Sequence, residues 1–79
     1  MLNSEFMTKR ATALAEAVRT SASDIDQQIA FAFTRTLSRD PDVEELALAK
    51  GIMSSDPDGQ ALVQLCHALL NLNEFVYIP

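Results

Sequence analysis

Residues 60–72 read QALVQLCHALLNL, and they set the architecture expected of the chain. From Gln60 to Asn73 no side chain is formally charged, counting His67 as neutral. Leucine, alanine and glutamine favour helix, and apolar residues occupy most of the helical wheel. A helix that is apolar over most of its circumference is normally the central one of its domain. The sequence therefore predicts an interior helix wrapped by the rest of the chain.

The polar residues of this segment form one narrow stripe. Spacings of three and four residues place side chains on the same side of a helix, and the members of the stripe are Gln60, Gln64, His67 and Asn71. A neutral stripe of this kind is either a solvated face or a wet seam against another domain. We take it as a candidate interface.

Start and stop signals divide the remaining chain into three further helices. The boundaries predicted for the four helices are about 4–19, 24–37, 42–53 and 57–72. Asp24 or Ser23 is the expected N-cap of the second helix, and Asp42 with Glu45 has the spacing of a capping box at the start of the third. Asp56 before a proline is the corresponding signal for the fourth.

Each of these three helices has an apolar face at helical spacing. The expected core residues are Phe6, Met7, Ala11, Leu14, Ala15 and Val18 in the first, Ile25, Ile29, Ala32, Phe33 and Leu37 in the second, and Leu46, Leu48, Ala49, Ile52 and Met53 in the third.

Phe31 is an exception to the pattern of the second helix. It falls among Gln27, Gln28 and Arg35, on the side away from the apolar stripe. A large aromatic residue on a polar face is either packed by another segment or offered to a partner. We favour packing by another segment and keep Phe31 as a candidate interface residue.

The last six residues, 74–79, read EFVYIP. They are aromatic and β-branched, so we expect an extended tail. Phe75 and Tyr77 either dock it internally, which we favour, or carry it into a neighbouring domain. The predicted fold is thus all-α: a compact four-helix domain over residues 1–79, with short connections and an extended C-terminal tail.

Charge and composition exclude several classes of partner. Eleven acidic residues against six basic ones give a net charge of −5, and no basic stripe compensates for it. Such a surface repels phosphate, so we expect neither nucleic acid nor an anionic membrane as a partner. No apolar run reaches membrane-spanning length. One cysteine, Cys66, forms no intramolecular disulfide.

Candidate catalytic and metal-binding residues fit structural uses better. Cys66 and His67 are adjacent, and adjacent helical residues point about 100° apart, so they do not face each other. Asp56 and Asp58 resemble the start of a calcium loop, but its twelfth position is Leu65, where a bidentate glutamate is required. Arg35 and Arg39 are a candidate anion clamp if the second helix reaches that far, although pairing with nearby acids is the favoured use. We expect no cofactor, no metal site and no catalysis by the isolated domain.

Three stretches resemble one protein family. They are residues 1–7 with Ala11 and Leu14-Ala15; Phe33 and Leu37-Ser38-Arg39 with Pro41 and Glu44-Glu45-Leu46; and the closing run 65–77, LCHALLNLNEFVY. The family is the domain of unknown function that ends many large planctomycete proteins, typically after a cytochrome-c-type domain. Two departures are Ser38, where the family usually has glycine, and Asp40, where a first proline is common.

This resemblance implies that the chain is the C-terminal piece of a larger exported protein. No catalytic residue can be carried over from the family to this chain. Arg39, Asn73, Glu74, Phe75 and Tyr77 fall in the family motifs, and we assign them to anchoring the fold.

Two functions remain as expectations. The first is a non-catalytic structural or interaction module that packs against other domains of its parent or against a protein partner. The second is an accessory part of an enzyme whose active site is completed by upstream domains, with His67 as the main contributor.

Overall fold

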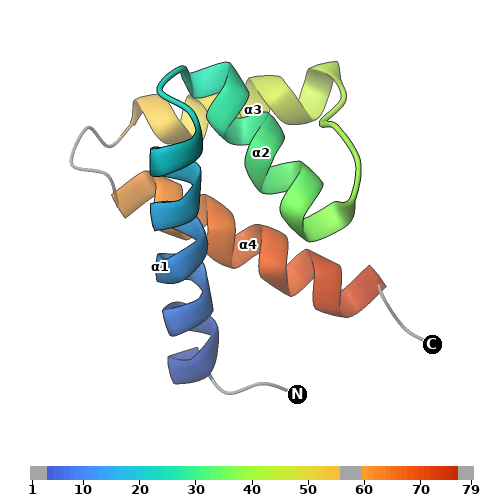
Figure 1. The fold of residues 1–79 in the computed structure, drawn as a ribbon. Helices are drawn as coiled ribbons and strands as arrows, with labels where there is room; N and C mark the ends of the chain where they lie inside the picture. The colour runs from blue at the N-terminus through green and yellow to red at the C-terminus, as the bar shows by residue number, and fades with distance from the viewer. Residues whose placement is uncertain (1–3, 56–59, 77–79) are drawn as a thin grey trace.

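The computed structural model describes residues 4–55 and 60–76, which form four α-helices joined by short connections (Figure 1). The helices are α1 (Ser4–Ser21), α2 (Ile25–Leu37), α3 (Val43–Ser54) and α4 (Gln60–Val76). The prediction of an all-α four-helix domain is confirmed.

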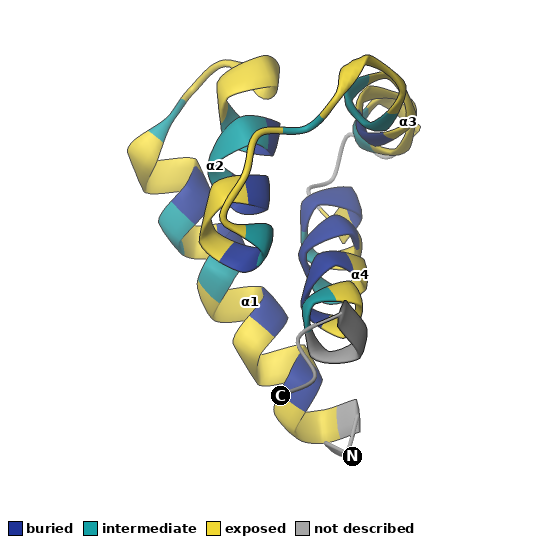
Figure 2. Ribbon diagram, turned by 90° about the vertical axis from the view of Figure 1, so that its right-hand side faces the viewer, coloured by how far each residue is buried: buried dark blue, intermediate teal, exposed yellow. Residues whose placement is uncertain are grey.

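α4 forms one side of this arrangement (Figure 2). It contacts each of the other three helices and packs most extensively against α1. α2 also touches all three of its neighbours, whereas α1 and α3 do not meet within the described residues. α1 crosses α4 obliquely, and α3 runs back above α4 in the opposite direction (Figure 1). The sequence predicts an interior helix wrapped by the rest of the chain, whereas α4 contacts the other helices with one side and leaves Gln64 and Asn71 exposed on the other.

The core lies where the buried faces of α1, α2 and α3 meet α4 (Figure 2). Its buried members are Met7, Ala11, Ala15, Val18, Ile29, Ala32, Phe33, Ala49, Leu62, Leu65, Cys66, Leu69 and Leu70. Small residues of α1, Ala11 and Ala15, are fully covered and allow a close approach of the helices. Burying such side chains contributes about 25 cal/mol per Å² of apolar surface removed from water.

The helix caps follow the sequence signals closely. The Asp24 side chain accepts a hydrogen bond from the Gln27 backbone N–H at the start of α2. Asp42 and Glu45 form both bonds of a capping box at the start of α3. Ser38 caps the C-terminal end of α2: it adopts the left-handed conformation with φ 59° and ψ 31°, and its N–H donates to the carbonyl of Thr34. Ser38 thus takes a conformation that favours glycine.

The prediction for the C-terminal tail was wrong in part. α4 continues through Val76, so residues 74–76 are helical and not extended. β-Branched and aromatic residues prefer strands only weakly, so a short run of them can continue a helix that has already formed. Tyr77 and the rest of the predicted tail lie outside the described residues, as do the expected cap Asp56 and the start at Pro57.

The predicted apolar face of α3 was also partly wrong. Ala49 is buried and Leu46 and Met53 pack against the core, but Leu48 is 71% exposed and Ile52 is 40% exposed. Because α3 is apolar on nearly all sides, its sequence pattern does not select one face. Phe6 and Ile25 are likewise half-exposed at the starts of α1 and α2, beyond the reach of the core.

Candidate interaction surface

The outward face of α4 holds the polar stripe that the sequence predicts. Gln60, Gln64 and Asn71 are exposed and His67 is half-buried, whereas the buried residues of α4 occupy the opposite side of the helix. Leu72 joins this face with 44% of its surface exposed. The four predicted residues therefore lie on the side of α4 that no described helix covers, and we call them the α4 stripe.

One hydrogen bond links two residues of the α4 stripe. The Asn71 amide Nδ2 lies 3.2 Å from Nδ1 of His67, one helical turn away. When this amide donates to Nδ1, a neutral imidazole carries its proton on Nε2. The contact holds the His67 ring beside Asn71 and leaves the Nε2 edge of the ring for any further partner.

The absence of charge distinguishes this face from the rest of the surface. No residue from Gln60 to Asn73 is Asp, Glu, Lys or Arg, whereas the exposed side of α1 carries Glu5, Lys9, Arg10 and Glu16. Covering charged groups requires their desolvation, which costs several kcal/mol per ion in an interface. Amides and a neutral imidazole can be covered at lower cost when hydrogen bonds replace their water. The α4 stripe is therefore suited to burial against a second polar but uncharged surface.

A second uncovered surface on α3 escaped the sequence analysis. Val43 is 84% exposed and Leu48 is 71% exposed, and Ala47 and Gly51 lie exposed between them at helical spacing. Contiguous apolar residues in contact with water often mark an interaction site. The available signal was that α3 has apolar residues in excess of those needed for one buried stripe.

Phe31 is half-buried and packs against the core. The guanidinium carbon of Arg35 lies 5.5 Å from the centroid of its ring, which is within the range of a cation–π contact. The ring is therefore covered partly by core residues and partly by the Arg35 side chain of the same helix. It offers less surface to a partner than the sequence pattern alone indicates.

Arg39 joins the end of α2 to the start of α3. Its Nη1 and Nη2 atoms each lie 2.7 Å from a carboxylate oxygen of Glu45, and Nη1 also donates to the carbonyl of Asp40 at 3.1 Å. The Arg39 hydrogen bond, followed by that from the Asp42 backbone, lowers the pKa of Glu45 to about 2. The same hydrogen bond raises the pKa of Arg39. Arg39 is thus occupied by the turn and does not form an anion clamp with Arg35.

Asn73 joins α4 to the end of α2. Its Nδ2 atom donates to the backbone carbonyl of Thr36 near the end of α2. The other predicted anchoring residues fall outside the part of the chain that the structure describes. These are the side chains of Glu74 and Phe75, and the whole of Tyr77.

Cys66 is fully buried among core residues, and burial raises the pKa of its thiol to about 11, although the nearby charge of Arg19 acts in the opposite direction. A thiol with this pKa is protonated at neutral pH, which makes it a poor nucleophile. Among residues 4–55 and 60–76, no three of the His, Cys, Asp and Glu side chains are grouped to hold a metal ion. Asp56 and Asp58, which resemble the start of a calcium loop, lie outside these ranges.

None of the described helices combines the length and hydrophobicity required to cross a bilayer. Comparison of the chain with family models, curated proteins and solved structures finds no match. The family resemblance is therefore carried only by the residues quoted for it.

Proposed function

We propose that this domain is a non-catalytic helical module that packs against other domains of a larger protein through the α4 stripe. The observation that carries the proposal is the uncharged outward face of α4 on a chain whose net charge is −5. The exposed Val43 and Leu48 of α3 support it, because they add apolar surface that the domain itself leaves uncovered.

The larger protein, on this proposal, is an exported one of the planctomycete type that the sequence resembles. The support is the set of motif residues at 1–15, 33–46 and 65–77. The gene sequence upstream of Met1 tests this part. A signal peptide followed by a haem-attachment motif is expected, and an independent gene with neither would contradict it.

The packing role is tested by adding charge to the α4 stripe. Gln64→Lys combined with Asn71→Lys places two ammonium groups in the seam, where they lose hydration on binding. We expect calorimetry to show at least a tenfold loss of affinity between this domain and the upstream region of its parent. Thr12→Lys with Thr20→Lys is the matched control, since both threonines are exposed on α1. Equal affinities for the two double variants would contradict the proposal.

A second candidate is that the module completes an enzyme active site with His67. It is favoured by the placement of His67 on the outward face, where the Asn71 amide orients its ring. His67→Ala in the parent protein would then reduce turnover by at least a hundredfold, while His67→Ala and wild type bind the upstream region equally well. Unchanged turnover would eliminate this candidate and leave the packing role in place.

A further inference from the structure

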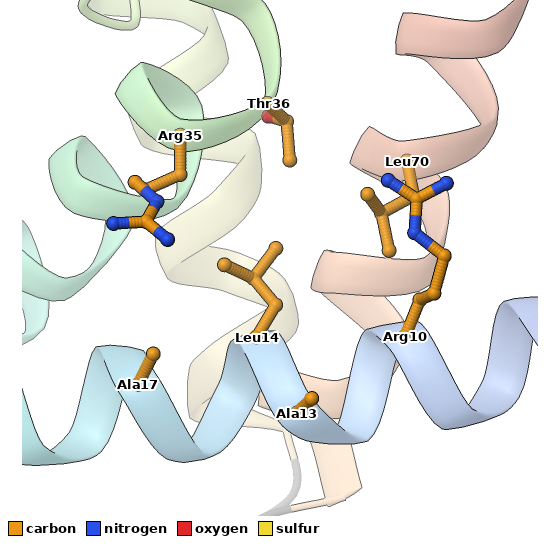
Figure 3. Close-up of a pocket in the computed structure, with 7 residues that line it drawn as sticks. All are labelled: Arg10, Ala13, Leu14, Ala17, Arg35, Thr36 and Leu70. Carbon is orange, nitrogen blue, oxygen red and sulfur yellow. The ribbon is translucent and has the colours of Figure 1, made fainter.

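A groove opens between α1, α2 and α4, on residues that the α4 stripe does not include. It has a volume of about 300 Å³ and is lined by Arg10, Ala13, Leu14, Ala17, Arg35, Thr36 and Leu70. In Figure 3 the side chains of Leu14, Leu70 and Thr36 project into its middle, while Arg10 and Arg35 stand at opposite ends. The groove therefore has an apolar middle and a guanidinium at each end.

Neither arginine at the groove has an acidic partner among the described residues. The ion pairs among the described residues join Arg39 to Glu45 and Lys50 to Asp26, and neither pair lies in the groove. The residues that line the groove include no carboxylate. Each guanidinium instead lies over the phenylalanine one turn earlier in its helix, at 6.0 Å for Arg10 over Phe6 and 5.5 Å for Arg35 over Phe31. These contacts restrain the two side chains, and their hydrogen-bond donors remain available for an anion.

The size of the groove limits its occupant. A volume of about 300 Å³ is at the lower end of small-molecule sites. Arg10 and Ala17 mark its ends on α1, and seven residues of helix span about 10 Å. A groove about 10 Å long with a guanidinium at each end suits an unbranched chain of about eight carbons with an anionic group at each end.

We propose that this groove binds an aliphatic dicarboxylate of about eight carbons. Each carboxylate accepts hydrogen bonds from one guanidinium, and the methylene chain lies on Leu14 and Leu70. The two ends of the ligand neutralise two like charges that the described structure leaves without counter-charges. The proposal does not depend on the packing role of the α4 stripe.

Octanedioate is the probe that tests this site. Titration into the 79-residue chain, followed by the methyl NMR signals of Leu14 and Leu70, is expected to give saturable shifts. Octanoate has the same chain and one carboxylate fewer, so it should bind about three- to fivefold more weakly, the effect of one exposed ion pair. 1,8-Diaminooctane has the reversed charge and should cause no shifts. The advantage of octanedioate over octanoate should shrink as salt is added.

Variants of the two arginines identify the groove as the site. Arg10→Gln and Arg35→Gln should each reduce the affinity for octanedioate to that for octanoate, and both residues are exposed, so the fold is retained. Lys9→Gln is the matched control, because it removes the same charge from α1 outside the lining. Ala13→Leu fills the groove and should abolish binding of both acids. Absence of octanedioate binding, equal binding of the diamine, or an equal effect of Lys9→Gln would overturn the proposal.

Discussion

The side-chain amide of Asn73 on α4 donates a hydrogen bond to the backbone carbonyl oxygen of Thr36 on α2. α2 ends at Leu37, so the carbonyl of Thr36 has no N–H one turn ahead within its own helix. Residue 73 therefore completes the hydrogen bonding of a helix end that lies far away in the sequence. It also fixes the position of the last turns of α4 against α2.

We expect Asn73→Ala to destabilise the domain by about 1 kcal/mol, the net value of a typical buried hydrogen bond. Asn71→Ala is the control: it removes the same side chain two residues earlier, where the amide is exposed and contacts only His67. Its cost should be below about 0.5 kcal/mol. Urea denaturation followed by circular dichroism measures both. Equal values for the two variants would mean that the contact to Thr36 does not stabilise the fold.

The pair formed by Arg39 and Glu45 predicts an acid-sensitive turn. The pKa of Glu45 is lowered to about 2 in the folded chain, against about 4.3 in an unfolded one. The stability that the lowered pKa of Glu45 contributes is therefore fully present at pH values above the pKa in the unfolded chain. It is lost as the pH falls towards 2. Glu45→Gln should remove this part of the pH dependence, whereas Glu44→Gln should retain it. Denaturation between pH 2 and 6 compares them, and an NMR titration of the Glu45 carboxyl tests the low pKa directly.

Ser38 adopts a left-handed conformation that costs residues other than glycine about 1 kcal/mol. We therefore expect Ser38→Gly to stabilise the domain by about 0.5 kcal/mol after allowing for the extra freedom that glycine gives the unfolded chain. Ser55 ends α3 with an ordinary right-handed conformation, φ −80° and ψ −10°. Ser55→Gly should therefore be neutral or destabilising. Thermal melts should show a raised Tm for Ser38→Gly and an unchanged or lowered Tm for Ser55→Gly if the backbone of Ser38 determines the effect.

Cys66 should be chemically inert in the folded protein. Its pKa of about 11, compared with about 8.5 for a free thiol, reduces its thiolate fraction at pH 8 by roughly two powers of ten. Reaction with a disulfide reagent should therefore occur only as fast as the chain unfolds. The raised pKa also predicts that the contribution of the Cys66 thiol to stability is fully present below about pH 8.5. This contribution declines as the pH rises towards 11.

The buried site of Cys66 should also distinguish its replacements. We expect Cys66→Ser to cost more than Cys66→Ala, because the serine hydroxyl would replace a thiol that desolvates readily. Rapid labelling of the folded wild-type chain would contradict the packing of α4 described above.

The orientation of α3 is tested by two leucines that are two residues apart. Leu46 packs against the core, whereas Leu48 is 71% exposed. Leu46→Ala should destabilise the domain by about 1–2 kcal/mol and Leu48→Ala by less than about 0.5 kcal/mol. The reverse order in urea denaturation would show that α3 is rotated about its axis relative to the arrangement described here.

The sequence determined the helices and their caps, because these depend on neighbours three or four residues apart. Asp42 and Glu45 form a capping box in any chain that starts a helix there. The spacing of apolar residues from Gln60 to Asn73 likewise predicted one buried side and one polar side for this helix. The exposure of Gln64 and Asn71 follows from that spacing, and so does the burial of Leu65, Cys66 and Leu69.

Only the tertiary structure decided the features that join residues distant in the chain. The face that α3 buries was undetermined, because apolar residues surround this helix and its packing on α2 and α4 selects Ala49 over Leu48. The contact between Asn73 and Thr36 and the groove between Arg10 and Arg35 exist because separate helices come together. Helical periodicity fixes where side chains point on one helix, whereas the relative position of two helices depends on how their surfaces pack.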